Sequence, residues 1–213
     1  MLNIILKELK EHAPFTFFGA ISGIALMWAF RNMSQEMAHD AFYLFHPLHV
    51  VLSAIATSAM FQRYKCPESG MKCNIFILLV IGYVGSVGIA TLSDSLIPYL
   101  GETFLNLPNR SPHIGFIEHW YIVNPAAIIG VAIAYFLPRT KFPHSGHVLL
   151  STWASLFHVI MALGASILWY TYVIIFLFLF VAVWLPCCIS DIVFPLLFIK
   201  DKNKYTSCCT HSH

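Results

Sequence analysis

Residues 75–92 read IFILLVIGYVGSVGIATL, a run of 18 positions without a charged side chain. A run of this length and apolarity allows a helix to cross the hydrocarbon core of a bilayer, which is about 30 Å thick. In that core every backbone N–H and C=O must be paired within the protein, and a helix pairs them along its own length. The run therefore predicts a membrane-spanning helix, and Ser93-Asp94-Ser95 follows it directly.

The rest of the 213-residue chain has the same character, with 58% hydrophobic and only 10% charged residues. A soluble domain carries about 25% charged residues, because its surface must face water. We therefore expect an all-α integral membrane protein with six transmembrane helices. The first apolar run has no small-residue cleavage site after it, so it is interpreted as an anchor and not as a removed signal peptide. The expected spans cover residues 13–30, 41–62, 74–98, 120–137, 147–168 and 170–198.

The basic residues predict the orientation, because cytoplasmic loops carry an excess of Lys and Arg. With six spans and a cytoplasmic N-terminus, ten of the twelve basic residues fall on the inside, and only Arg31 and Arg110 fall outside. The N- and C-termini are both predicted to be cytoplasmic. The inside residues are Lys7, Lys10, Arg63, Lys65, Lys72, Arg139, Lys141, Lys200, Lys202 and Lys204.

Three short motifs recur in the same order along the chain and predict an internal repeat. They divide the chain into a three-helix repeat over residues 1–110, a second over 111–200, and a Cys/His-containing tail over 201–213. Because each repeat has an odd number of spans, the second must be inverted relative to the first, a plan common among transporters. The matched pairs are Glu11-His12 with Glu118-His119, HPLHVVLS (46–53) with HSGHVLLS (144–151), and SDSLIP (93–98) with SDIVFP (190–195).

Topology sorts the polar residues of these motifs into two equivalent clusters, one toward each face of the membrane. Each cluster would take two histidines and an aspartate from one repeat and a Glu-His pair from the other. The outer cluster is predicted to hold His46, His49, Asp94, Glu118 and His119. The inner cluster is predicted to hold His144, His147, Asp191, Glu11 and His12.

Histidines spaced i, i+3 lie on one helix face, so both imidazoles can converge on one point. Neutral imidazole and carboxylate are ligands for divalent transition metals such as zinc, iron and manganese. Ionisable residues within a membrane are costly and are functional by default, which favours a role for His46, His49, Asp94 and Asp191. The residues at span ends, Glu11-His12 and Glu118-His119, could equally face water or headgroups.

Three functions fit these clusters. The first is a metal-ion transporter, with the lipid bilayer and the metal ion as partners. The second is an intramembrane metal-dependent hydrolase or transferase acting on lipid, with Glu118 or Glu11 as general base. The third, and the least favoured, is a b-type haem carrier, with His49–His119 and His147–His12 as ligand pairs. No basic stripe suggests nucleic acid, and small-residue helix faces such as Gly19 to Gly23 could also pack a homodimer.

The remaining polar residues within the spans have ordinary alternative roles. His158 is interpreted either as a ligand or proton carrier, or as a buried histidine bonded to a neighbouring helix. Ser53 and Ser151 could hydrogen-bond a ligand but are expected to bond the backbone. Cys187 and Cys188 could be ligands of the inner cluster but are interpreted as ordinary small apolar residues. The cysteines of the expected inside loop and tail should be thiols in a reducing cytoplasm. They are Cys66, Cys73, Cys208 and Cys209.

Overall fold

The apolar runs form helices along almost their whole length in the computed structural model, which describes residues 2–65, 74–137, 141–163, 169–188 and 194. No strand occurs in these ranges. The first half contains α1 (Leu2–Ala29), α2 (Gln35–Lys65), α3 (Ile75–Thr91), the π-helical segment η1 (Leu92–Leu96) and α4 (Ile97–Phe104). The second half contains α5 (Gly115–Glu118), α6 (Trp120–Phe136), α7 (Lys141–Ala162) and α8 (Trp169–Cys188).

Polar side chains cap the beginnings of α2 and α3. The Ser34 hydroxyl accepts a hydrogen bond from the backbone N–H of Met37 at the start of α2 (3.2 Å). The side chain of Asn74 accepts one from the N–H of Phe76 at the start of α3 (2.9 Å). These N-caps satisfy backbone donors that the first turn of a helix leaves unpaired.

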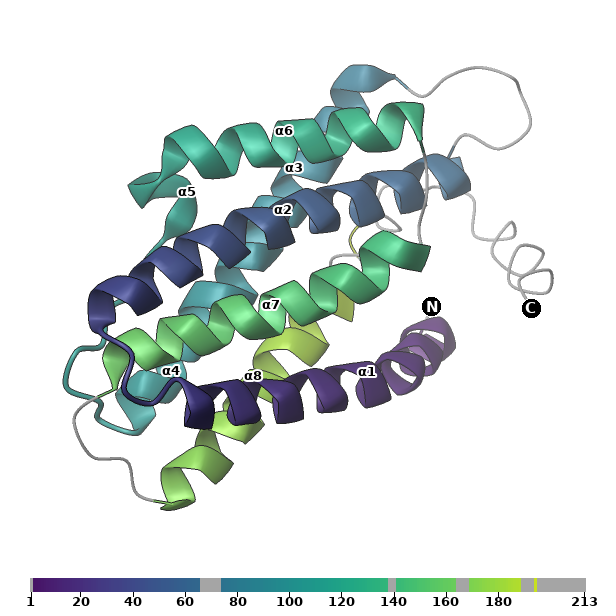
Figure 1. The fold of residues 1–213 in the computed structure, drawn as a ribbon. Helices are drawn as coiled ribbons and strands as arrows, with labels where there is room; N and C mark the ends of the chain where they lie inside the picture. Colours follow the sequence, from purple (N-terminus) through teal and green to yellow (C-terminus); the bar gives the residue numbers. More distant parts are fainter. Residues whose placement is uncertain (1, 66–73, 138–140, 164–168, 189–193, 195–213) are drawn as a thin grey trace.

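The helices form two layers with α2 at the centre (Figure 1). Helices α6, α2, α7 and α1 lie side by side in one layer, and α3, η1, α4 and α8 pack behind them. Gly130 lets α6 approach α2 closely, since a Cβ at that position would lie 2.5 Å from the Val51 carbonyl oxygen. This close approach is the kind of contact that small residues permit between apolar helices.

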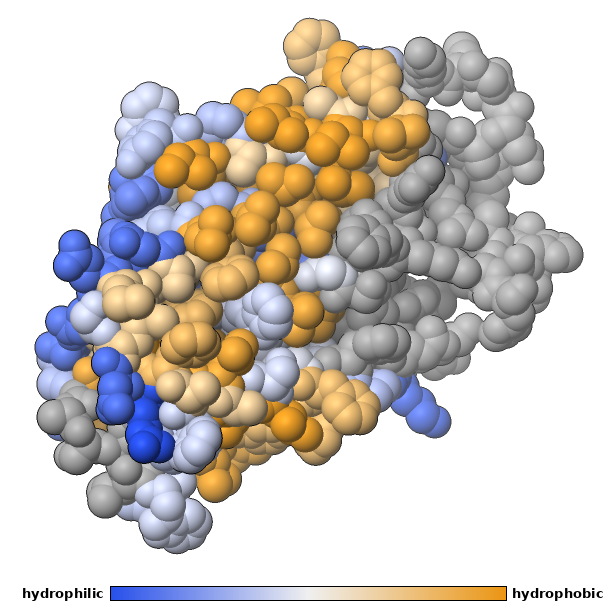
Figure 2. Space-filling model, viewed as in Figure 1, coloured by the Kyte–Doolittle hydropathy of each residue, from blue (hydrophilic) through white to orange (hydrophobic). Residues whose placement is uncertain are grey.

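Three helices in the described part of the chain are long and apolar enough to cross a membrane: Gln35–Gln62, Ile75–Phe104 and Trp169–Cys187. Three further apolar helices are shorter, covering Thr16–Ala29, Trp120–Phe136 and Gly146–Ala162. Figure 2 shows a broad hydrophobic belt across one face of the molecule, with hydrophilic residues gathered at one end. Length, composition and surface are all compatible with insertion into a membrane.

Several helices extend beyond the spans expected from the sequence, with α1 beginning at Leu2 instead of residue 13 and α2 at Gln35 instead of residue 41. The third span was expected to end at Pro98, but the helix continues through η1 and α4 to Phe104. Proline lacks the N–H that would bond the carbonyl four residues earlier, here that of Asp94. The chain adapts by a π turn, in which the Ile97 N–H donates to the Leu92 carbonyl, so the helix passes the proline without ending.

Candidate metal centre

The Asp94 side chain lies at the middle of the π-helical segment, directly after the apolar run of α3. A π turn inside an α-helix is uncommon and is found frequently at functional sites, because it shifts the residues that follow around the helix axis. Here it belongs to the surface on which η1 packs against α7 and α8. Asp94 is 0% exposed, so a carboxylate is buried between the two layers of helices.

Four donors surround this carboxylate. The Nδ1 atoms of His46 and His49 lie 2.9 Å and 2.7 Å from Asp94 Oδ2. The hydroxyls of Ser93 and Ser151 donate to Oδ1 at 2.6 Å and 2.8 Å. An ionised carboxylate only accepts, so this set requires Nδ1–H on both imidazoles and leaves each Nε2 as a lone pair when the ring is neutral.

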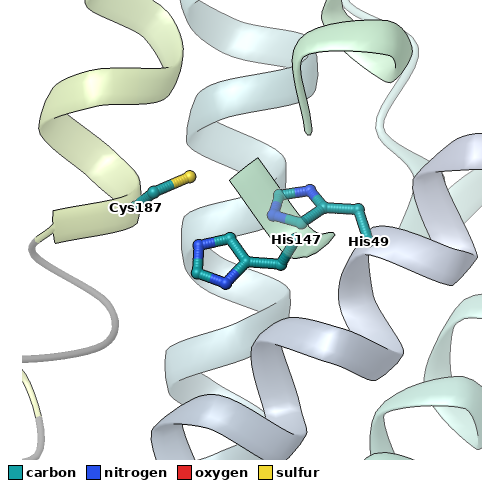
Figure 3. A group of neighbouring side chains, drawn as sticks. All are labelled: His49, His147 and Cys187. Carbon is teal, nitrogen blue, oxygen red and sulfur yellow. The ribbon is translucent and has the colours of Figure 1, made fainter. Parts of the chain in front are cut away.

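Helices α2, α7 and α8 bring a second group of side chains together next to Asp94. His49, His147 and Cys187 are all buried, and one potential ligand atom from each lies within 4.8 Å of the other two. The rings of His49 and His147 stack with centroids 5.6 Å apart. Figure 3 shows the Cys187 sulfur pointing toward the space beside the two rings.

The donor set of this group suits a transition metal. His49 Nε2 is buried and has no hydrogen-bond partner among the described residues, as expected for a nitrogen that could bind a cation. Asp94 holds the opposite nitrogen of the same ring, which is the arrangement that fixes the tautomer of metal-binding histidines and raises their basicity. Two imidazoles and one thiolate suit zinc or copper better than manganese, which prefers oxygen ligands.

His46 shares the Asp94 carboxylate but lies apart from the three-residue group. Its ring packs against Gly115 of α5, where a Cβ would lie 2.6 Å from both His46 Cδ2 and Nε2. The sequence led us to expect that both imidazoles of HxxH would converge on one metal ion, but the structure places only one of them in the candidate ligand group. His46 and His49 converge on Asp94 through Nδ1, and only His49 belongs to the group with Cys187.

Glu118 and His119 lie around Tyr43, one turn before His46 on α2. The Tyr43 hydroxyl donates to Glu118 Oε2, and the backbone N–H of Ile114 donates to Oε1 at 3.2 Å. His113 Nδ1 lies 3.3 Å from Glu118 Oε2, and the His119 ring stacks on Tyr43 at 3.7 Å. Burial alone would raise the pKa of the Glu118 carboxyl, but the bonds from Tyr43 and His113 outweigh it and hold the pKa below its usual range.

The structure changes the expected pattern of two separate clusters. His147, expected in the inner cluster, lies against His49 of the outer cluster, and Ser151 of the same helix bonds Asp94. The reason is geometric: His147 lies nearly two turns into α7, on the surface that packs against the centre of α2. The two halves thus meet in one buried centre.

Several residues of the expected inner cluster lie beyond what the structure describes. Asp191 is outside the described residues. Glu11 and His12 belong to α1 and His144 to α7, but their side chains are outside the described part. The haem ligand pair His49–His119 has separate partners, because His119 stacks on Tyr43 whereas His49 contacts Asp94 and His147. The pair His147–His12 includes one of the undescribed side chains.

No family model, curated protein or solved structure matches this chain.

Sequence reasoning preferred other roles for two residues of this centre and gave none to a third buried residue near it. Cys187 was considered as a ligand but interpreted as an ordinary apolar residue, and its sulfur belongs to the candidate ligand group. Ser151 was expected to bond the backbone, but it donates to Asp94. Glu102, one of the largest fully buried side chains, received no role, yet it pairs with His158 at 2.6 Å. The i, i+4 spacing of His147 and Ser151 was the available signal, since it predicts that both lie on one face of α7.

Proposed function

We propose that this protein binds a divalent transition metal ion within the membrane, at His49, His147 and Cys187, and carries it across. One observation supports this most directly: three buried potential ligands lie within 4.8 Å of one another, beside a carboxylate that holds the tautomer of His49. Buried polar groups in a membrane are costly and are rarely retained without a function. The ion is the transported substrate in this proposal.

The donor set points to zinc as the first candidate among the metals expected from the sequence. A thiolate favours zinc over iron or manganese when imidazoles complete the set, and zinc accepts tetrahedral N/S sites readily. Two imidazoles and one thiolate leave one position for water. An incompletely enclosed ion is easier to release, which a carrier requires and a structural site does not.

Transport is favoured because both halves of the chain supply the centre. His49 and Asp94 come from the first half, and His147, Ser151 and Cys187 from the second. Substrate sites between two repeats are typical of secondary transporters, and here the π-helical segment η1 carries Asp94 beside the centre. The proposal includes six membrane spans, two inverted repeats and cytoplasmic termini. Three helices of the described residues are long and apolar enough to cross a membrane, which supports the membrane part of it.

A metal-dependent hydrolase is the second candidate, and the same three-ligand set supports it. Catalytic zinc sites keep one position open for a water, whose pKa the metal lowers to about 7. Of the two general bases expected for such an enzyme, Glu118 is hydrogen-bonded to Tyr43 and Ile114, not to the ligand group, and the side chain of Glu11 lies outside the described residues. This arrangement makes catalysis the weaker proposal.

Cobalt substitution tests the ligand set. We expect the purified protein to bind Co²⁺ with a thiolate charge-transfer absorption band, because Cys187 ligates through sulfur. Cys187→Ser should remove this band, and Cys188→Ser, the matched change one residue along, should keep it. Zn²⁺ should displace the cobalt. A band that persists in Cys187→Ser, or no stoichiometric metal in the wild type, would contradict the proposal.

Proteoliposomes separate transport from catalysis. We expect Zn²⁺ to enter vesicles containing the wild type and not those containing His49→Ala, whereas His39→Ala should behave as the wild type. His39 is the matched control because it lies on the same helix with a side chain 38% exposed. Binding without flux, together with release of lipid products, would replace the transporter by the hydrolase.

A further inference from the structure

A second buried carboxylate–imidazole pair lies on α4 and α7, outside the metal centre. Glu102 and His158 are each 1% exposed, and His158 Nδ1 lies 2.6 Å from Glu102 Oε1. His158 Nε2 lies 3.2 Å from the Pro112 carbonyl oxygen. Glu102 Oε2 has no hydrogen-bond partner among the described residues.

These contacts require the pair to hold a proton. A backbone carbonyl only accepts, so His158 Nε2 must donate to Pro112. The short Nδ1–Oε1 contact then needs a second hydrogen, either on Nδ1 as imidazolium with carboxylate, or on Oε1 as imidazole with carboxylic acid. Either way the pair is neutral in this geometry, and it becomes an anion when that proton leaves.

A row of buried polar side chains on α7 lies between the metal centre and this pair. His147, Ser151, Ser155 and His158 follow at intervals of four, four and three residues, so they share one buried helix face. The Ser155 hydroxyl lies within hydrogen-bond distance of the carbonyls of Ser93 (2.9 Å) and Ser151 (2.8 Å). From His147 to His158 the helix rises about 16 Å.

Among the described residues, few other titratable groups surround His158. Phe42 of α2 covers the ring edge-on, with centroids 5.4 Å apart. His113 is the titratable neighbour from the loop before α5, with its ring 5.5 Å away. From α8, Phe178 packs against Gly101 beside Glu102. His113 in turn contacts Glu118, which lies toward solvent with a side chain 41% exposed.

We propose that Glu102 and His158 form a proton-binding site whose proton is exchanged for the metal ion. This inference rests on the proposed metal-binding function. Arrival of a divalent cation at His49, His147 and Cys187 favours the anionic state of the pair, because charges interact strongly where water is excluded. One proton then leaves the pair past Pro112 and His113 toward the end of the molecule where Glu118 lies, and release of the metal allows the pair to take it up again. Chains of acidic residues and histidines serve as proton relays in membrane transporters.

The test counts protons released on metal binding by the full-length protein in detergent. Zn²⁺ is titrated in lightly buffered solution with a pH indicator, so transport is not needed for the measurement. The wild type should release the thiol proton of Cys187 and, in addition, the proton of the pair. Glu102→Gln should bind Zn²⁺ but release one proton fewer, because its amide N–H donates permanently to His158 Nδ1. Glu36→Gln, an exposed carboxylate at the start of α2, is the matched control and should release as many protons as the wild type.

The outcomes separate the two proposals. If Zn²⁺ binds and Glu102→Gln releases as many protons as the wild type, the proton site is overturned and the metal centre stands. If the wild type binds no Zn²⁺, both fail together. Should Glu102→Gln not fold, Glu102→Met provides the same comparison, because methionine is similar in length to glutamate but cannot hold the proton. In proteoliposomes, each Zn²⁺ that enters should acidify the opposite compartment less for either variant than for the wild type, because the variants exchange only the thiol proton.

Discussion

Asp94 and Glu102 are both buried carboxylates paired with histidine, but their hydrogen bonds have opposite consequences. Asp94 accepts from two imidazole Nδ1–H groups and two hydroxyls, so all four neighbours donate and no extra proton is needed. Glu102 faces one imidazole whose other nitrogen already donates to a carbonyl, so a proton must lie between them. The same two kinds of residue therefore leave imidazole lone pairs available at Asp94 and hold a proton at Glu102.

The difference arises from what surrounds the imidazoles and not from the carboxylates. The outward nitrogens of His46 and His49 meet no hydrogen-bond partner among the described residues, whereas that of His158 meets the Pro112 carbonyl. An acceptor on the far side of a ring commits that nitrogen to carrying hydrogen. The far-side partner of each histidine thus determines whether its carboxylate pair suits a metal or a proton.

Replacing each carboxylate by its amide should give the largest effect and tests this comparison directly. Asp94→Asn places an NH₂ group among four donors, so we expect the free energy of unfolding to fall by about 3 kcal/mol, as when buried charged hydrogen bonds are lost. Glu102→Gln supplies the hydrogen that the pair needs, so we expect a change within about 0.5 kcal/mol. Equilibrium unfolding in mixed micelles measures both. Equal losses for the two variants would show that the pairs do not differ in their protons.

Moving His46 alone should give an intermediate effect. A Cβ at Gly115 would lie 2.6 Å from the His46 ring, so Gly115→Ala must displace the ring from Asp94 at a cost of about 1–2 kcal/mol. Because His46 is not in the ligand group and contacts only the partner of His49, metal affinity should fall by less than the roughly 10- to 100-fold lost when a direct partner of a ligand is changed. Gly88→Ala is the control, since nothing lies within 4 Å of a Cβ there. A complete loss of metal binding in Gly115→Ala would make His46 a ligand.

The helical fold could be predicted from the sequence because its signals are local. Apolar runs of sufficient length must form helices in a bilayer, and a helix covers most of the described residues of each expected span. The continuation of the third helix past Pro98 could not be predicted from the sequence. A proline can end a helix, kink it, or be accommodated by a π turn that lets the helix continue. Which of these occurs depends on packing against α7 and α8.

The candidate site could be predicted only where residues share an element. The spacing of His46 and His49 predicts one face, and the structure places both on Asp94. The contact between His49 and His147 depends on the axial position of α2 relative to α7. The charges of the loops do not determine that position. The role of Cys187 could not be decided from the sequence either, because a cysteine in an apolar helix has no local feature that distinguishes a ligand from a packing residue.

Replacing a third carboxylate, Glu118, should give the smallest change in the free energy of unfolding. Because Glu118 is partly exposed, it shows how much of the effect at Asp94 comes from burial. Its pKa in the folded protein is lowered by Tyr43 and His113, so its stabilising contribution is present above the pKa of the unfolded chain and is lost as pH falls through the folded value. Its side chain is 41% exposed, so Glu118→Gln should lower the free energy of unfolding by less than about 1 kcal/mol near neutral pH. That difference should vanish in acid, which unfolding of the variant and the wild type across acidic to neutral pH would measure. Glu36→Gln should show no such convergence, and a Glu118→Gln defect that persists in acid would mean that shape, not charge, stabilises this contact with Tyr43.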